Sequence, residues 1–131
     1  GELFVLASLV HGADYVDYAQ DLFPYLDELG QAVYGYVIER VRSGVYKSPT
    51  GLFTALDPKF EAEVGAIVNY RFIEGDGKKK YDDCVKNLQI RSLDKRQKDI
   101  LERLRSTRDK ALLEQLDEVN KQLNRIKNRK E

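Results

Sequence analysis

Residues 112–126 read LLEQLDEVNKQLNRI, a stretch in which apolar residues recur at alternating intervals of four and three. These positions are Leu112, Leu116, Val119, Leu123 and Ile126. Such heptad spacing predicts a helix with one apolar seam that packs against another helix. A second seam comes before it in the sequence, at Leu93, Gln97, Ile100 and Leu104.

The residues between the two seams indicate how the helices connect. Ser106–Asp109 (STRD) fits a capping box and marks a tight turn. Two helices joined by so short a turn are expected to fold back on each other as an antiparallel hairpin. The first helix extends over Lys79–Leu104 without a Gly or Pro, which makes it on the order of 40 Å long.

The rest of the chain contains shorter helical patterns that are separated by Gly and Pro. The expected helices are Leu3–His11, Tyr15–Asp21, Glu28–Ser43, Thr50–Leu56 and Lys59–Phe72. Asp14, Ser48 and Asp57 lie where helix N-caps are needed. Alternating apolar patterns are absent, so the sequence predicts an all-α protein. We expect a small multi-helix bundle, joined by a long helix to a C-terminal antiparallel helical hairpin.

Charge and aromatic content both change near the clearest break in the chain, Glu74–Gly77 (EGDG). Residues 1–76 contain 5 Lys/Arg and 12 Asp/Glu, a net charge of −7, whereas residues 77–131 contain 17 and 10, a net charge of +7. All 13 aromatic residues lie at or before Tyr81. We therefore expect a globular helical subdomain at 1–76, followed at 77–131 by the long helix and the hairpin.

Composition limits the class of protein. No apolar run approaches the roughly 20 residues that span a bilayer, and Leu3–Val10 lacks the basic region of a signal peptide. The single cysteine, Cys84, excludes an internal disulfide framework. A reduced, cytoplasmic protein is the expectation. Gly1 is expected to be a cloning remnant at the start of a fragment from a longer protein.

The sequence offers little for catalysis. His11 is the only histidine, and on an apolar helix we expect it to be a hydrogen-bonded core or helix-end residue. Cys84 has no second Cys or His nearby, which argues against a nucleophile or metal ligand. The carboxylates of the first part are scattered singly, as capping residues are. We expect no catalytic residue, no metal ligand and no cofactor, and therefore a non-catalytic fragment.

Nucleic-acid binding is an alternative interpretation of the basic second part. Its strongest basic clusters are Lys78, Lys79 and Lys80 and the tail residues Arg125, Lys127, Arg129 and Lys130. However, ten acids are interleaved with the bases, as on a solvated helix face. The segment after Tyr81 also lacks aromatic rings on which bases could stack. Direct nucleic-acid binding is therefore not the expectation.

A protein partner explains the hairpin better. Leu101 and Leu113 lie beside their seams and not within them. Either they widen the hairpin's own contact, or they offer an apolar stripe to another helix pair. A homodimer formed through the heptad seam is a further alternative, although we expect a monomer.

The order of these elements resembles the C-terminal helicase-binding domain of bacterial DNA primase. The resemblance is carried by the opening LFVLASLVH, the stretch YDDCVKNLQIRSLDKRQKDILERLR and the closing LLEQLDEVNKQLNRIK. It implies a globular part that stimulates the helicase and a hairpin that docks on the N-terminal domains of the hexameric replicative DNA helicase. By position, the docking residues would be Leu101, Arg105, Arg108, Leu113, Leu116, Asn120, Leu123 and Lys127.

The N-terminal domain of the replicative helicase itself has a similar order of elements and is the competing interpretation. In that protein the hairpin leads through a linker into an ATPase domain. The present sequence ends in the charged RIKNRKE, which suits a natural C-terminus and favours the primase.

Overall fold

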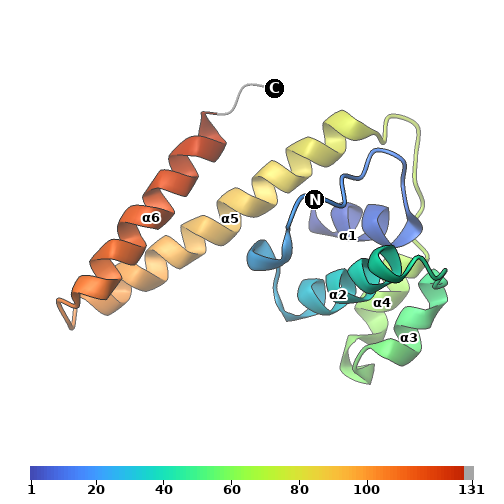
Figure 1. Ribbon diagram of the computed structural model, residues 1–131, viewed down its shortest axis with the longest axis horizontal. Coiled ribbons are helices and arrows are strands. Elements are labelled where there is room, and N and C mark those ends of the chain that lie inside the picture. Colours follow the sequence, from blue (N-terminus) through green and yellow to red (C-terminus); the bar gives the residue numbers. More distant parts are fainter. Residues whose placement is uncertain (129–131) are drawn as a thin grey trace. The chain divides into compact units, whose positions relative to one another are not determined.

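In the computed structural model, which describes residues 1–128, every regular element is helical (Figure 1). The longer elements are α1 (Glu2–His11), α2 (Glu28–Ser43), α4 (Glu61–Val68), α5 (Lys78–Leu104) and α6 (Lys110–Lys127). The shorter ones are α3 (Leu52–Ala55) and the 3₁₀ helices η1 (Phe23–Tyr25), η2 (Pro49–Gly51) and η3 (Pro58–Phe60). No strand occurs in this range, so the predicted all-α class is confirmed. Arg129 and Lys130 of the basic tail, and the last three residues of RIKNRKE, lie outside the described residues.

The chain forms two compact units, Gly1–Val85 and Lys86–Glu131, and the division between them falls inside α5. The sequence places the change at the glycine-rich break before α5, whereas the first turns of this helix belong to the first unit. Counted over these units, the net charges are −6 and +6. The opposite charge of the two parts therefore persists with the later division.

Helix α1 is the centre of the first unit. All seven residues of Phe4–Val10 are buried, because α1 packs against both α2 and α4. The facing helices contribute buried aliphatic side chains, Val33 and Val37 from α2 and Val64 and Ile67 from α4. A helix that is apolar on nearly every side is therefore found in the middle of a bundle.

The C-terminus of α1 is closed by a side chain from α2. Gly12 ends the helix in the left-handed conformation at φ 67°. The Arg40 guanidinium donates from Nη1 to the Val10 carbonyl at 2.8 Å and from Nη2 to the Leu9 carbonyl at 3.0 Å. The same Nη2 lies 3.4 Å from the Tyr18 hydroxyl. A cation at a helix C-terminus is electrostatically favourable, so Arg40 both satisfies carbonyls and joins two helices.

The predicted helix at Tyr15–Asp21 is wrong, because this segment consists of turns. Asp17 accepts a hydrogen bond from the Ala19 N–H, and Asp21 accepts one from the Phe23 N–H, both at 3.0 Å. Such bonds to the backbone two residues ahead compete with helix formation. Asp14, the predicted cap, therefore has no helix to cap.

The predicted helix at Lys59–Phe72 is correct in its middle but too long. It begins as η3, where Asp57 caps the Lys59 N–H at 2.9 Å, and α4 ends at Val68. Beyond α4, the Tyr70 and Phe72 rings pack on Phe4, with centroids 6.1 and 6.2 Å away. Aromatic packing on α1 therefore replaces the last turn of the expected helix.

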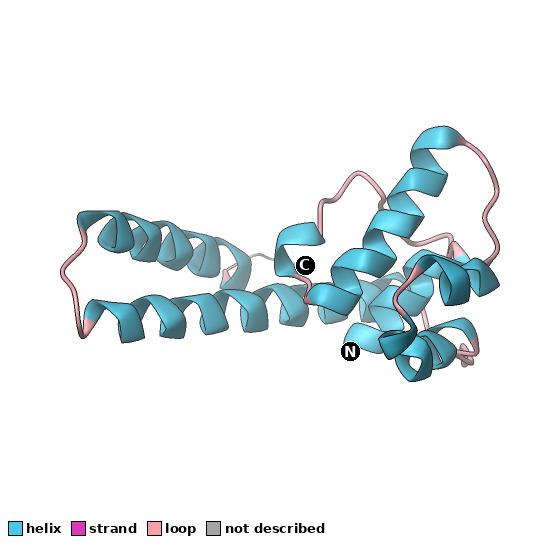
Figure 2. Ribbon diagram, turned by 90° about the horizontal axis from the view of Figure 1, so that it is seen from below, coloured by secondary structure: helices cyan, strands magenta, loops and turns pink. Residues whose placement is uncertain are grey.

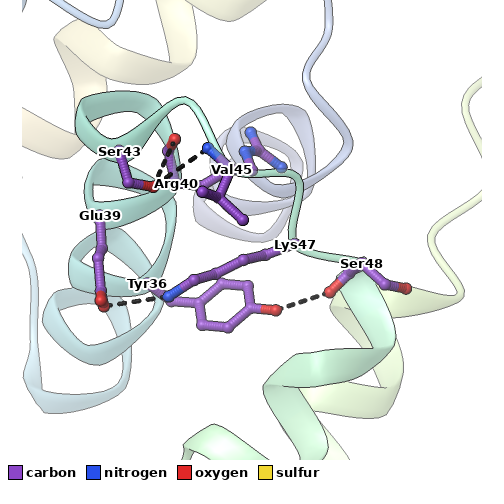
Figure 3. Close-up of polar contacts among 7 residues, drawn as sticks. All are labelled: Tyr36, Glu39, Arg40, Ser43, Val45, Lys47 and Ser48. Carbon is purple, nitrogen blue, oxygen red and sulfur yellow. Dashed lines mark hydrogen bonds and ion pairs between the residues drawn. The ribbon is translucent and has the colours of Figure 1, made fainter.

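The loop after α2 is held at both ends by polar contacts (Figure 3). Tyr36 donates its hydroxyl to the Ser48 carbonyl at 2.8 Å, and Lys47 pairs with Glu39 at 3.1 Å. A side chain on Gly51 would collide with the Tyr36 hydroxyl, so glycine is needed for this close approach. Ser48 also caps η2, as predicted, by accepting from the Thr50 N–H.

An ion pair fixes the beginning of α5 within the first unit. The Asp76 carboxylate, 4% exposed, accepts from Lys80 Nζ at 2.6 Å and from the Ile73 N–H at 2.7 Å. Lys80 Nζ also lies 4.5 Å from the centre of the Phe4 ring. The hydrogen bond from Lys80 is the main reason that the pKa of Asp76 lies below its usual value, and the Ile73 N–H adds to the effect.

Replacing Asp76 with Asn is expected to destabilise the protein at neutral pH but not in acid. A carboxyl with a lowered folded-state pKa stabilises the fold above its unfolded pKa of about 3.9. That contribution is lost as the pH falls through the lower folded-state value. Thermal unfolding followed by circular dichroism should show a difference between parent and variant at pH 7 that narrows below about pH 4. Asp82→Asn, which removes the exposed ion pair with Lys78, is the control. A difference in thermal stability between the parent and Asp76→Asn that stays the same at every pH would contradict the assignment.

Candidate protein-docking site

The second unit is an antiparallel helical hairpin. The part of α5 that follows Lys86 and the whole of α6 lie side by side in both views (Figures 1 and 2). The seam between them is filled by buried side chains, namely Leu93 and Ile100 from α5 and Leu112, Val119, Leu123 and Ile126 from α6. The hairpin and its seam are therefore confirmed.

A polar pair sets the register of the hairpin. Gln97, at a seam position of α5, donates from Nε2 to Asn120 Oδ1 of α6 at 2.7 Å. A polar residue at a seam position is satisfied in one register only, so it specifies alignment at some cost in stability. Asn120 thus has an internal partner in addition to any role on the surface.

The turn between the helices differs from the predicted capping box. Asp109 is itself the N-cap of α6, and its Oδ1 accepts from the Ala111 N–H at 2.8 Å. Ser106 instead donates its hydroxyl to the Arg103 carbonyl at 3.3 Å, at the end of α5. Helix α6 therefore has its N-cap at Asp109, three residues later than a capping box with Ser106 as the N-cap would require.

Leu101 and Leu113 are 47% and 53% exposed, so they do not widen the seam. Leu101 follows the seam residue Ile100, and Leu113 follows Leu112. Each is therefore rotated by about 100° from its seam neighbour. Viewed along one axis, this rotation runs clockwise in one helix and counter-clockwise in its antiparallel partner, so both leucines lie on the same edge of the hairpin. We call this the leucine edge, consisting of Leu101, Leu113, Asn120 and Lys127.

The opposite edge of the hairpin is polar. It is formed by the residues that precede seam positions, including Arg103, Gln115 and Gln122. The leucine edge is therefore the apolar side surface of this unit, close to the turn. We therefore treat the leucine edge as the candidate docking surface of this unit.

Exposed basic side chains lie at both ends of the leucine edge. Arg105 and Arg108 are exposed in the turn, and Lys127 is exposed at the other end of the leucine edge. Arg105 lies 3.4 Å from Glu102, an exposed pair of the kind that contributes little to stability. An apolar centre with a charged rim is the usual anatomy of a transient protein interface.

The structure divides the residues that sequence reasoning assigned to docking. Leu101, Arg105, Arg108, Leu113 and Lys127 are exposed. Leu116 and Asn120 are half-buried, and Leu123 is buried in the seam. The exposed five are available to a partner directly, whereas the other three support the shape of the hairpin.

Two basic residues of α5 and two of α6 pair with carboxylates. Lys78 pairs with Asp82 at 2.9 Å, and Lys80 pairs with Asp76 at 2.6 Å. In α6, Lys121 pairs with Asp117 at 3.1 Å and Arg125 lies 3.6 Å from Glu118. A phosphate backbone would have to compete with these acids, which weakens the nucleic-acid interpretation.

His11 and Cys84 are the residues whose types could indicate catalysis or metal binding. His11 is the last residue of α1, and its Nε2 lies 3.1 Å from the Ile67 carbonyl oxygen. Cys84 is a half-buried free thiol. Within residues 1–128, no group of three or more His, Cys, Asp or Glu side chains is placed to hold a metal ion.

A cleft in the first unit was missed by sequence reasoning. It lies between η1 with the turns before it and the outer face of α2, and it exposes Phe23 and Val41. Val41 lies one helical turn after the buried Val37 but is itself 45% exposed. The presence of Phe23 and Val41 on the surface depends on tertiary packing, for which the sequence gives no local signal.

Comparison with known proteins gives no relative for this chain. No family model matches the sequence, no curated protein matches it, and no solved structure matches the fold. Within the described residues, no helix is both long enough and apolar enough to span a bilayer.

Proposed function

We propose that this chain is the helicase-binding domain of a bacterial DNA primase. In this proposal the hairpin unit docks through its leucine edge on the N-terminal domains of the hexameric replicative DNA helicase. The two half-exposed leucines beside a closed seam are the observation that supports it most directly. The parent enzyme would make primers in the cytoplasm, and this part of it would carry no catalytic residue.

Docking would act by raising the local concentration of primase at the replication fork. A tethered module converts a second encounter into an intramolecular one, which raises the effective concentration of the attached enzyme. In this proposal the acidic first unit favours one conformation of the helicase's N-terminal domains over another, and so changes the rate at which the helicase hydrolyses ATP. The order of elements that resembles the primase domain supports this assignment, and so do the exposed arginines of the turn.

The double variant Leu101→Ser/Leu113→Ser tests the proposal. Full burial of one leucine side chain contributes about 1.5–3 kcal/mol. Docking would bury only the exposed half of each side chain, so loss of both should weaken binding by about tenfold to 100-fold. The measurement is isothermal titration calorimetry of this chain against the purified hexameric helicase. Arg103→Ser/Gln115→Ser on the opposite edge is the matched control, since it truncates two exposed side chains of the same hairpin.

Parent affinity retained by the leucine variant would count against the leucine edge as the docking surface. Absence of any complex with the parent chain would count against the helicase assignment itself. A parallel titration with single- and double-stranded DNA covers the nucleic-acid alternative, which requires micromolar binding with a steep dependence on salt.

A further inference from the structure

The outer face of α5 in the hairpin unit carries a line of positive charge. Arg91 and Lys95 lie two positions before and two positions after the seam residue Leu93. Lys98 lies two positions before the seam residue Ile100. Because each residue turns an α-helix by about 100°, all three cations lie about 160° from the seam, on the side of α5 away from α6. All three are exposed, and we call them the cationic stripe.

The acids of this part of α5 lie beside the stripe or beyond it. Asp94 and Asp99 are rotated toward the two edges of the hairpin. Within the described residues, neither forms an ion pair with a cation of the stripe. Glu102 is the next residue along the outer face, and it pairs with Arg105 at 3.4 Å. Residues 86–104 contain 6 Lys/Arg and 3 Asp/Glu, a net charge of +3, so acids and bases do not balance here.

The outer part of α6 shows the opposite arrangement. Its exposed cations Lys121 and Arg125 lie 3.1 Å from Asp117 and 3.6 Å from Glu118. In the cationic stripe, like charges instead follow one another at spacings of four and three, where they repel and destabilise a helix. Proteins depart from such local rules mainly at functional sites. The uncompensated stripe therefore indicates a surface that meets an anionic partner.

A row of cations of this kind fits the phosphates of a nucleic-acid duplex. Along the helix axis the cations are about 6 Å and about 4.5 Å apart, and a duplex presents one negative charge per about 1.7 Å of its axis. All three can therefore reach phosphates of one duplex together. The segment after Tyr81 has no aromatic rings on which the bases of a single strand could stack, so a duplex is favoured over a single strand.

A membrane surface fits the stripe less well. Helices that bind at a bilayer surface insert an apolar face between the lipids. The apolar residues of α5 next to the stripe, Leu93 and Ile100, are buried in the seam. The stripe therefore supplies charge without the apolar surface that membrane binding needs.

We propose that the cationic stripe is a sequence-independent contact for the phosphate backbone of a nucleic-acid duplex. The stripe is on the outer face of α5 and the leucine edge is on the side of the hairpin, so one molecule can make both contacts. Three phosphate contacts release few counterions, so the binding is weak and its salt dependence is moderate. This distinguishes it from a nucleic-acid-binding module that uses the whole basic part. The proposal does not depend on the identity of the helicase.

Fluorescence anisotropy of a labelled DNA duplex titrated with the chain provides the test. Three neutralised phosphates give a slope of log K against log salt of about −2.7. Affinity should therefore fall about 20-fold between about 50 mM and about 150 mM salt. Absence of binding at the lower salt concentration would overturn the proposal. A slope several times steeper would do so as well, since it would assign the contact to bases outside the stripe.

The triple variant Arg91→Gln/Lys95→Gln/Lys98→Gln removes the stripe. It should weaken duplex binding at least about tenfold and flatten the dependence on salt. Glutamine is a good helix former and the three positions are exposed, so circular dichroism should report an intact hairpin. Binding that matches the parent in affinity and salt slope would overturn the proposal.

The matched control is Lys110→Gln/Lys121→Gln/Arg125→Gln. It lowers the net charge by the same three units, through exposed residues of the other helix of the hairpin. Because salt screens charges that do not touch the duplex, this variant should bind within about threefold of the parent. An equal loss of affinity in both triple variants would show that overall charge decides binding and would overturn the proposal.

Two further probes separate a nucleic-acid contact from other occupants of the stripe. Vesicles of phosphatidylserine and phosphatidylcholine offer anionic lipid at the same phosphate concentration as the duplex. Tighter binding to the vesicles, lost in the stripe variant, would assign the stripe to a membrane surface and overturn the proposal. The stripe variant should also bind the helicase like the parent. Loss of helicase binding with unchanged duplex binding would assign the stripe to the helicase contact and overturn the proposal.

Discussion

Leu123→Ala should lower the free energy of unfolding by about 2–5 kcal/mol, as is usual for truncating a buried leucine. Leu123 is 4% exposed and lies in the seam between α5 and α6. The hairpin unit has only this seam for a core, so neighbouring side chains have little material with which to fill the cavity. Urea unfolding followed by circular dichroism at 222 nm, a wavelength that reports helix, would measure the loss.

Leu113→Ala is the control for this prediction. It removes the same atoms from the same helix at a half-exposed position, where substitutions usually change stability by less than about 0.5 kcal/mol. Helicase binding should show the opposite order. Leu113→Ala should weaken it more than Leu123→Ala, because Leu113 is on the leucine edge and Leu123 is not. Equal destabilisation by the two variants would mean that the seam is not the core of the hairpin.

Arg40→Ala is expected to have a comparable effect on the first unit. The Leu9 and Val10 carbonyls belong to buried residues at the end of α1. Leaving a buried acceptor unpaired costs about 1–3 kcal/mol, and two acceptors are affected. Leu9 retains hydrogen bonds from the Tyr18 hydroxyl at 3.3 Å and from the Gly12 N–H at 3.4 Å, so the loss should come mainly from the Val10 carbonyl and be about 1–3 kcal/mol.

Two further substitutions test the origin of that loss. Arg40→Lys keeps the charge but cannot donate to both carbonyls with a planar fork, so it should recover only part of the stability. Arg42→Ala removes an exposed arginine two residues along the same helix and should change stability by less than about 0.5 kcal/mol. Full recovery with Lys would show that charge at the helix end matters and that the paired geometry does not.

The longest elements are the ones that sequence patterns located well. Helix α2 has the predicted bounds, and α5 begins one residue before the predicted start. Their periodicity extends over several turns and outweighs local effects. The helix predicted at residues 15–21 does not form, because its aspartates accept hydrogen bonds from nearby N–H groups. The predicted end of α4 is too late, because Tyr70 and Phe72 pack on Phe4. Both outcomes depend on contacts that a local pattern does not contain.

The candidate sites differ in the same way. The leucine edge could be predicted in part, since Leu101 and Leu113 break the heptad pattern in the sequence itself, but only the structure shows that both are exposed. The α2 cleft could not be predicted, because it is made by a turn segment and a helix that meet only after folding. Gly35 gave a weak local signal, a glycine within a strong helical pattern, but such a signal does not indicate a cleft.

The two units of this neutral chain carry net charges of opposite sign, −6 and +6. A molecule without net charge gains little from long-range attraction, yet a charged surface still attracts one of its units and repels the other. Orientation would thus be selected before contact, within the roughly 10 Å over which charge acts at 0.1 M salt. An anionic partner would therefore meet the hairpin first and a cationic partner the bundle around α1.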